Sequence, residues 1–243
     1  MKKNIKDMRN KSKEMRRLDN NTPFAIKEAF NQLRTNLMYT SNDKDGCPVY
    51  GITAVEVGVG KSTVCANISI SFSQIGKKVL IIDGDMRRPV QHKIFAYDKK
   101  HIGLSDLLAG IEGSDENALI CPSENLYIIP SGCIPPNPSE LLLNKRFSEY
   151  MEKWKQEYDI IFIDLPPIGV VSDPLTIAKD MNGYVFITLA NYSDSVRVTK
   201  SMETIESVGG NITGVVINGS NRKSATYTYK KNRYKYSYYY AEK

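Results

Sequence analysis

The sequence predicts an α/β fold in which a mostly parallel β-sheet carries helices on both faces. Three observations indicate this class. Apolar runs of strand length alternate with helical patterns over most of the 243 residues, and this alternation is typical of parallel sheets covered on both sides. One run leads into a Gly-Lys-Ser-Thr segment that precedes a helical pattern, and two other runs end in aspartate. With 41% hydrophobic residues, the chain suffices for one domain with a sizeable core.

The Gly-Lys-Ser-Thr segment has the strand–loop–helix context of the phosphate-binding loop of P-loop NTPases. An apolar run over residues 49–54 precedes it. In such loops glycines let backbone N–H groups curl around phosphate, the lysine reaches the terminal phosphates, and the first hydroxyl binds Mg²⁺. Val55 stands where the usual pattern has a further glycine, so a buried strand–turn–helix with a chance Gly-Lys-Ser is the alternative. The residues predicted to bind ATP here are Gly58, Val59, Gly60, Lys61, Ser62 and Thr63.

Two apolar runs end in acidic residues. The run over residues 78–82 is followed by Asp83 and Asp85, and the run over residues 158–163 by Asp164. In a parallel sheet, ligands bind outside the carboxyl ends of the strands, so these three side chains are expected to converge near the phosphates. Carboxylates there hold Mg²⁺ directly or through its waters. A single aspartate at a strand end is usually a helix cap or turn former, but three beside one phosphate loop indicate a metal site.

The remaining elements follow from apolar spacing. Residues 90–124 have one short helical pattern and are otherwise predicted to be irregular. Ser139 is the expected N-cap of a helix that carries Phe147, Tyr150, Met151 and Trp154 inward. The other expected elements are a helix over residues 23–39, strands over 126–129, 184–189 and 212–218, and a helix over 195–208.

Composition excludes several classes of protein. No window approaches 18 consecutive apolar residues, and the charged start lacks the apolar core of a signal peptide. The chain is therefore expected to be cytoplasmic. Its four cysteines and two histidines lack metal-ligand spacing, so we interpret them as structural or incidental.

Charge divides the chain into three parts. Residues 1–17 contain eight Lys or Arg and two Asp or Glu, and residues 222–243 contain seven and one. Each end therefore carries +6, and because the whole chain also carries +6, the middle carries −6. We predict a flexible basic segment over residues 1–22, a globular domain over 23–221 and a basic tail over 222–243. Two basic ends suit an anionic membrane, a partner, a neighbouring subunit's acidic site, or simple solvation.

The tail is also rich in tyrosine. Seven of the fifteen tyrosines lie in the last 17 residues among lysines and an arginine. Such tyrosines either stack on nucleic-acid bases or accept phosphate, each phosphorylation adding about −1.5 to −2 charge. The second role better fits a chain with an ATP site. The expected acceptors are Tyr227, Tyr229, Tyr234, Tyr236, Tyr238, Tyr239 and Tyr240.

Together these motifs resemble the bacterial tyrosine kinases of capsular and exopolysaccharide synthesis. The resemblance covers residues 24–243 and implies a P-loop kinase domain that uses Walker motifs. It is specific because Arg-Arg-Pro after the paired aspartates, and Pro-Pro-Asn-Pro-Ser-Glu-Leu-Leu, are not general features of P-loop proteins. The segments that carry it are residues 58–63, 80–89, 135–142, 159–164 and the tyrosine-rich tail.

The resemblance implies a role for each site residue. Lys61 contacts phosphate, Ser62, Asp85 and Asp164 hold Mg²⁺, and Asp83 is the base or a water-mediated Mg²⁺ partner. Physical reasoning leaves open whether Asp83 or Asp85 is the carboxylate beside the attacking phenol. The tail tyrosines are phosphorylated between subunits. Asn218 resembles the adenine-contacting asparagine of related ATPases, with a strand-end turn former as the alternative.

The resemblance also implies partners. The kinase is a separate chain, activated by the cytoplasmic end of a membrane-spanning modulator that places it at the inner face of the plasma membrane. A cognate tyrosine phosphatase is expected, and nucleic acid is not. Homo-oligomers form through a helix motif matched by Glu28 and Arg34, although the middle arginine of that motif is Asn31 here.

Two other functions remain as alternatives. The first is an ATP switch resembling the septum-site and plasmid-partition ATPases. Those proteins usually carry a second lysine early in the phosphate loop, where this chain has Val55, Glu56 and Val57. The second, a nucleic-acid-binding protein, is disfavoured because the acidic middle of the chain repels phosphate backbones.

Overall fold

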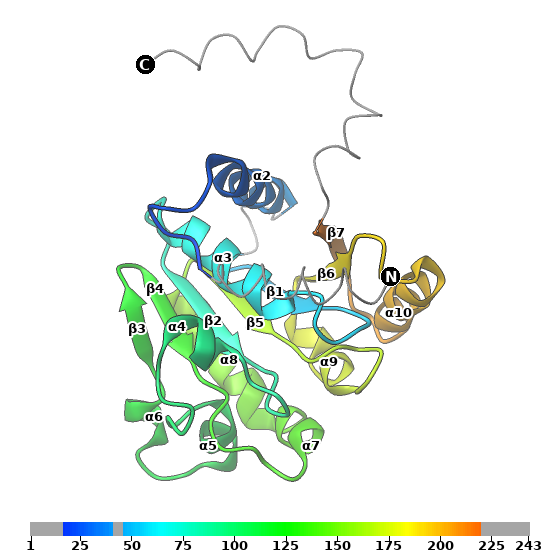
Figure 1. The fold of residues 1–243 in the computed structure, drawn as a ribbon. Coiled ribbons are helices and arrows are strands. Elements are labelled where there is room, and N and C mark those ends of the chain that lie inside the picture. The colour runs from blue at the N-terminus through cyan, green and yellow to red at the C-terminus, as the bar shows by residue number, and fades with distance from the viewer. Residues whose placement is uncertain (1–16, 41–45, 220–243) are drawn as a thin grey trace, which may run out of the picture.

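The computed structural model describes residues 17–40 and 46–219. The tail tyrosines and most of the N-terminal basic segment lie outside these ranges. Within them, seven strands form one sheet in the order β3-β4-β2-β5-β1-β6-β7, in which β3 is antiparallel to β4 and all other neighbours are parallel. This confirms the predicted α/β sheet (Figure 1). The strands are β1 (Val49–Thr53), β2 (Val79–Asp83), β3 (Ile120–Ser123), β4 (Leu126–Ile129), β5 (Ile160–Asp164), β6 (Gly183–Leu189) and β7 (Ile212–Asn218).

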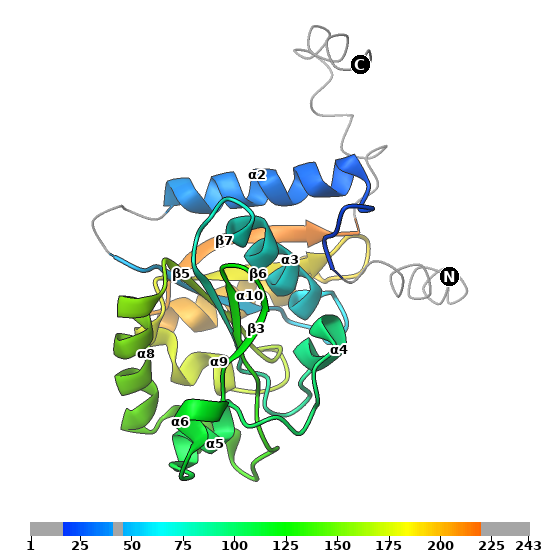
Figure 2. The ribbon, with the colours of Figure 1, turned by 90° about the vertical axis from the view of Figure 1, so that its left-hand side faces the viewer.

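Helices cover both faces of the sheet, and α2 lies outside α3 (Figure 2). None of the helices in the described ranges is long and apolar enough to cross a bilayer. The helices are α2 (Phe24–Thr40), α3 (Lys61–Ser73), α4 (Gln91–Phe95), α5 (Leu104–Ala109), α6 (Ser114–Asn117), α7 (Pro138–Leu142), α8 (Lys145–Glu157), α9 (Asp173–Thr176), the 3₁₀ helix η1 (Ala178–Asp180) and α10 (Ser195–Ser207).

The core has two halves, one on each face of the sheet. Helices α2, α3 and α4 pack against one face, and α5, α7, α8 and α10 against the other. Strand β5 contributes to both, because Ile161 and Ile163 point to the second face and Ile160 and Phe162 to the first. All five residues of β5 are buried, which explains its unbroken apolar sequence.

The helix expected from Ser139 is in fact two helices. Helix α7 follows Asn137, and α8 begins separately after Asn144, whose side chain accepts a hydrogen bond from the Arg146 N–H. The expectation that Ser139 caps the longer helix was therefore wrong, because Asn144 takes that role. The burial prediction is confirmed for Phe147, Met151 and Trp154, which form the buried side of α8, whereas Tyr150 is only partly buried.

The segment over residues 90–124 is more regular than predicted. It contains three short helices, α4, α5 and α6, and the edge strand β3, rather than one helix in irregular chain. These elements have only four to six residues each, which is too short for apolar periodicity to reveal them.

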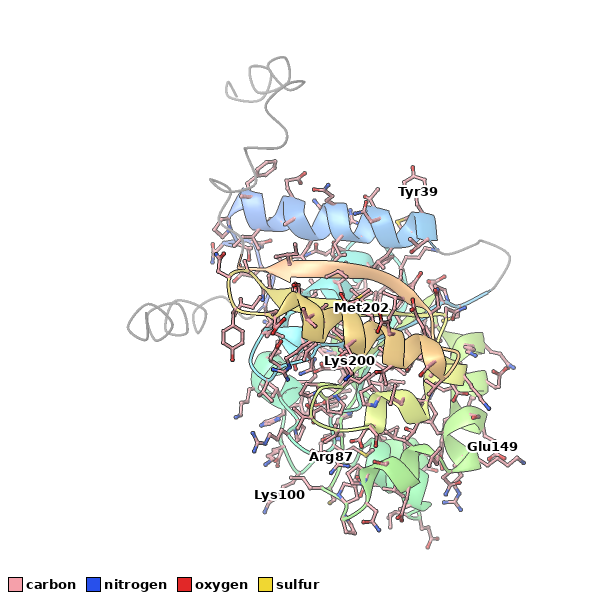
Figure 3. The ribbon with its side chains drawn as sticks, turned by 90° about the vertical axis from the view of Figure 1, so that its right-hand side faces the viewer. Tyr39, Arg87, Lys100, Glu149, Lys200 and Met202 are labelled. Atoms are coloured by element: carbon pink, nitrogen blue, oxygen red, sulfur yellow. The ribbon has the colours of Figure 1, made fainter. Side chains whose placement is uncertain are left out.

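Strand β7 forms one edge of the sheet. Strand β7 pairs only with β6 among the described strands, and Figure 3 shows it between α2 and α10. Its side chains are partly exposed, with Ile217 at 62%. Near the N-terminal end of the described chain, Leu18 is buried. Its N–H donates to Oδ1 of Asn67 in α3 at 2.6 Å.

One ion pair joins the loop after β2 to α9, and a hydroxyl of α7 bonds to the same carboxylate. Arg87, which follows β2 and is labelled in Figure 3, donates from Nε to Oδ2 of Asp173 at 2.8 Å and from Nη2 to Oδ1 at 2.9 Å. The Ser139 hydroxyl donates to the same Oδ1. The Asp173 side chain is fully buried and that of Arg87 is 39% exposed. The Arg87 and Ser139 hydrogen bonds hold the pKa of Asp173 below its ordinary value, against the opposing effect of burial.

We expect Asp173→Ala to lower the free energy of unfolding by about 2 kcal/mol at pH 7, because Arg87 and Ser139 lose a charged acceptor. Since the folded-state pKa of Asp173 is lowered, its contribution is complete above the ordinary aspartate value near 4 and is lost as the pH falls through and below it. Urea unfolding at pH 7 and pH 3.5 measures both effects. The exposed Asp98→Ala is the control, and an equal loss in the two variants would contradict the expectation.

Candidate active site

The phosphate loop, residues 54–60, connects β1 to α3 as the sequence predicts. Gly58 and Gly60 have φ of 83° and 98°, a left-handed conformation that favours glycine. No side chain caps the first turn of α3, so its leading N–H groups suit an anion. Lys61 begins the helix and is only 8% exposed. Gly58, Val59, Gly60, Lys61, Ser62 and Thr63 therefore lie together in the loop and the first turn of the helix.

Asn218 at the end of β7 contacts the phosphate loop. Its Nδ2 donates to the Val59 carbonyl oxygen at 2.9 Å, and its Oδ1 accepts from the Gly219 N–H. A Cβ at position 60 would lie 2.3 Å from the same Nδ2, so only glycine fits there. The structure thus brings Asn218 to the loop and gives it a role in holding the loop backbone.

Asp83 and Asp164 lie side by side at the carboxyl ends of the neighbouring parallel strands β2 and β5. They are paired in the register of β2 and β5, and both are fully buried. Burial raises the pKa of Asp83 well above its ordinary value, and the charges of Asp164 and Asp85 raise it further; the nearby N–H groups of Gln91 and Asp85 offset this only in part. Burial raises the pKa of Asp164 to about 6, with Lys61, Ser62 and Gln91 acting in the opposite direction.

Several oxygens of this pair have no hydrogen-bond partner within the described ranges: both of Asp83 and Oδ1 of Asp164. Buried oxygens of this kind suit a hard cation. The described chain holds no group of three or more His, Cys, Asp or Glu side chains placed to bind a metal alone. Mg²⁺ commonly takes one or two carboxylates and completes its shell with phosphate and water. The side chains present therefore fit Mg²⁺ bound together with a nucleotide.

Asp85 differs from Asp83 in its surroundings. It is 7% exposed, and its Oδ1 accepts from the Arg88 N–H at 3.0 Å. One of its oxygens thus stabilises the turn after β2. The structure brings all three predicted carboxylates to one edge of the sheet, next to Lys61 and Ser62.

Gln91, at the start of α4, is a site residue that sequence analysis missed. It is fully buried, and its Nε2 donates to Oδ2 of Asp164 at 2.9 Å and to the Ser62 carbonyl oxygen at 3.2 Å. It lies 73 positions from Asp164 in a five-residue helix. No spacing pattern in the sequence could have connected the two.

Sequence analysis placed Glu56 in the phosphate loop but did not predict which residues it contacts. Its Oε2 accepts from the Ser193 hydroxyl at 3.1 Å, and its Oε1 lies 3.7 Å from the Arg197 guanidinium. Ser193 precedes α10 and Arg197 belongs to it. The carboxylate thus fastens the loop to α10.

The predicted oligomer-interface residues lie on α2. Glu28 is exposed and accepts a hydrogen bond from Asn31 at 2.9 Å. Arg34 is half-buried and donates to the carbonyl and hydroxyl oxygens of Ser71 in α3, both at 2.7 Å. Arg34 therefore contributes to packing within the chain.

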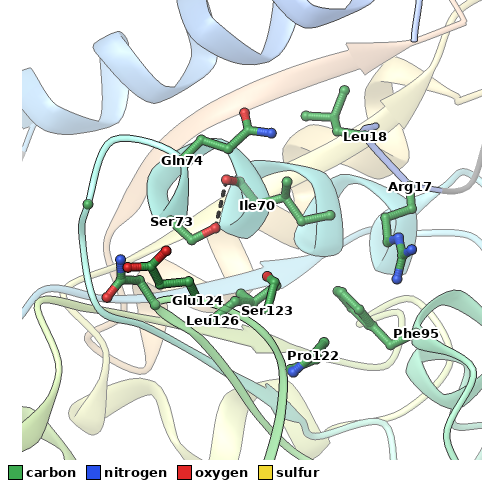
Figure 4. A pocket seen from close by; sticks show the side chains of 12 residues that line it. Arg17, Leu18, Ile70, Ser73, Gln74, Phe95, Pro122, Ser123, Glu124 and Leu126 are labelled. Carbon is green, nitrogen blue, oxygen red and sulfur yellow. Dashed lines mark hydrogen bonds between the residues drawn. The ribbon is translucent and has the colours of Figure 1, made fainter. Parts of the chain in front are cut away.

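A cavity of about 550 Å³ opens at the far end of α3 from the phosphate loop (Figure 4). Ile70, Ser73 and Gln74 of α3 line it together with Phe95 and residues 122–126. None of the predicted site residues does. The phosphate loop and carboxylates, rather than this cavity, carry the candidate chemistry.

We expect Asp83→Asn to raise the free energy of unfolding at pH 8 by about 1–3 kcal/mol, because the carboxylate is solvated in the unfolded chain but disfavoured in the buried site, where its oxygens have no hydrogen-bond partner within the described ranges. The folded-state pKa of Asp83 is raised, so wild-type stability is complete below the ordinary aspartate pKa and falls as the pH rises through the folded-state value. The gain in the variant should therefore shrink toward pH 4.

Urea unfolding without metal or nucleotide measures this difference. Asp98→Asn, at an exposed position, is the control. A variant with a lower unfolding midpoint than wild type at pH 8 would contradict the expectation.

Comparison with known proteins gives consistent results. The AAA domain family matches residues 49–208. Tyrosine-protein kinase CpsD of Streptococcus agalactiae is 36% identical over 202 residues, which are 82% of this chain and 86% of that protein. Among solved structures, the kinase domain of Escherichia coli tyrosine kinase ETK has a TM-score of 0.74 and 30% identity, covering 80% of this chain and 77% of that one.

The septum-site-determining protein MinD of Pyrococcus horikoshii, solved with Mg-ADP, is more distant. It has a TM-score of 0.60 and 26% identity and covers 74% of this chain and 76% of its own. It shares the P-loop fold, whereas CpsD and ETK share more of the sequence. The chain therefore belongs to the AAA domain family and to the bacterial tyrosine-protein kinases that include CpsD.

Proposed function

We propose that this chain is an ATP-dependent protein-tyrosine kinase that phosphorylates its own C-terminal tyrosine cluster between subunits. Through this reaction it regulates capsular or exopolysaccharide synthesis or export. The observation that carries the proposal is that Lys61 of the phosphate-loop helix lies near the buried, paired carboxylates of Asp83 and Asp164. A chain with this site and seven clustered tyrosines holds both the donor site and the acceptors.

The reaction moves the γ-phosphoryl group of ATP to a tyrosine. A bond forms between the phenol oxygen and the γ-phosphorus, the bond from that phosphorus to the β–γ bridging oxygen breaks, and ADP leaves. Lys61 and the N–H groups of the loop stabilise the phosphate charge. The phenol proton passes to a carboxylate. We favour Asp83, because both of its oxygens are without a hydrogen-bond partner within the described ranges, whereas one oxygen of Asp85 is already engaged by the Arg88 N–H.

The residues proposed to hold Mg²⁺ are Ser62, Asp85 and Asp164. When bound, the ion neutralises charge on the transferred phosphate. Ser62 lies in the first turn of α3, and Oδ1 of Asp164 has no hydrogen-bond partner within the part of the chain that the structure describes. Asn218 is proposed to contact the adenine from the end of β7, while its Nδ2 keeps the loop backbone in place.

The proposed partners follow from the family and from the charge of the chain. A membrane-spanning modulator activates the kinase through its cytoplasmic segment and places it at the inner face of the plasma membrane. Glu28 and Arg34 on α2 contribute to a homo-oligomer in which one subunit phosphorylates the next. A cognate tyrosine phosphatase reverses the reaction. Nucleic acid is not a partner, because the folded middle of the chain is acidic.

The alternative is an ATP switch of the septum-site type, which the likeness to MinD supports. Glu56 argues against it. Those ATPases usually carry a lysine early in the loop, whereas Glu56 places a carboxylate there and turns it to Ser193 and Arg197. They also have no need for a tyrosine-rich tail.

We expect Lys61→Met to abolish tyrosine phosphorylation, with a loss of at least about 100-fold, because the phosphate charge loses its lysine. Mass spectrometry of protein incubated with Mg-ATP and the modulator's cytoplasmic segment measures it. Phosphate should be confined to the tail in the full chain and absent from a chain ending at Arg222. An exposed substitution of the same type, Lys153→Met, is the matched control.

Release of inorganic phosphate by the full chain without phosphate on tyrosine would favour the ATP-switch alternative. Phosphotyrosine in Lys61→Met at the wild-type level would exclude the proposed site.

A further inference from the structure

We propose that Gln91 is a positioning residue for the metal of this site. It fixes Ser62 and Asp164 relative to each other through its amide nitrogen and accepts a hydrogen bond from a metal-bound water through its amide oxygen. The inference rests on the proposed function, because it requires Mg²⁺ and nucleotide to bind at the phosphate loop.

The contacts of the Gln91 side chain cross two elements of the site. Its Nε2 reaches Oδ2 of Asp164 at 2.9 Å, at the end of β5, and the carbonyl oxygen of Ser62 at 3.2 Å, in the first turn of α3. An amide nitrogen has two hydrogens, so both bonds form at once. Its backbone N–H also lowers the pKa of Asp83, although neither Asp83 oxygen has a hydrogen-bond partner within the described ranges. The Gln91 side chain therefore connects two residues proposed to hold the metal.

The orientation of this amide is fixed by its neighbours. Both groups near Nε2, a carboxylate and a carbonyl, are acceptors, so a flipped amide would place its oxygen against two other oxygens. The amide oxygen Oε1 must then point elsewhere, and it is buried without a partner within the described ranges. An unpaired buried acceptor costs about 1–3 kcal/mol, which indicates that a donor belongs there.

The chemistry of the site restricts that donor. When Mg²⁺ is bound, Asp83, Asp85 and Asp164 are ionised, so these carboxylates and the phosphates offer only oxygens that accept. Lys61 contacts phosphate in the proposed reaction. Water bound to Mg²⁺ donates both of its hydrogens outward, and Mg²⁺ usually keeps several waters in protein sites. Residues that orient metal ligands in this indirect way commonly change metal affinity by about 10–100-fold when they are replaced.

The test is the gain in nucleotide affinity that Mg²⁺ produces, measured with a fluorescent ADP analogue. In Gln91→Met, which keeps the length of the side chain and removes both kinds of hydrogen bond, the Mg²⁺ concentration for half of this gain should rise about 10–100-fold. Affinity measured in EDTA should stay at the wild-type level, because the loop and Lys61 are unchanged. That second reading also establishes that the variant is folded.

Two further variants complete the design. Gln74→Met, at an exposed position at the far end of α3, is the matched control and should behave as wild type. Gln91→Asn keeps the amide but is one methylene shorter, so it should give an intermediate Mg²⁺ requirement even if Gln91→Met is unstable.

The outcomes separate this inference from the proposed function. If Mg²⁺ strengthens ADP binding in wild type and equally in both Gln91 variants, Gln91 has no positioning role and the proposed function stands. If wild type binds ADP no better with Mg²⁺ than in EDTA, both the proposed metal site and this inference are overturned.

Discussion

The site depends on two carboxylates that the sheet forces together. Asp83 and Asp164 are opposite each other in the register of β2 and β5, and neighbouring strands lie only about 4.8 Å apart. Both are buried, so water cannot screen their repulsion. Neither can move away without breaking the sheet. The fold therefore maintains a concentration of negative charge that Lys61, Ser62 and Gln91 offset only in part, and a bound cation or a proton relieves the remainder.

Polar contacts between distant segments hold the loops around this charge. Glu56 connects the phosphate loop to Ser193 and α10, and Asn218 fixes the carbonyl of Val59. Asp173 joins the loop after β2 to α7 through Arg87 and Ser139. The two sequence segments that most specifically mark the family, Arg-Arg-Pro and Pro-Asn-Pro-Ser, thus meet at one buried carboxylate. These two segments therefore have a structural role, which is to bind Asp173 through Arg87 and Ser139.

The sequence predicted the parts of the fold that are governed by local pattern. Unbroken apolar runs identified the buried strands, and because parallel strands share a carboxyl edge, the aspartates at their ends could be placed together from the sequence alone. The phosphate loop could also be predicted from the sequence, because its glycines and lysine are close together in the chain. Asn218 required the family resemblance, because a single asparagine at a strand end has no pattern of its own.

The sequence could not predict residues whose partners are remote. Gln91 lies 73 positions from Asp164, and Arg87 lies 86 from Asp173; single polar side chains in short helices or loops have no periodicity that points to such partners. The wrong cap at Ser139 has a related origin. Ser139 and Asn144 are both good caps, and only the packing of Asp173 shows that Ser139 is used elsewhere.

The strand order has a kinetic consequence. Strand β1, which leads into the phosphate loop, lies between β5 and β6, and its Val49 pairs with Ile161. During synthesis on the ribosome, β1 emerges more than a hundred residues before either neighbour and has no edge to join. Such non-local parallel pairing forms slowly because a long loop must close first. The strand that carries the phosphate loop is thus among the first made and can be among the last to settle into the sheet.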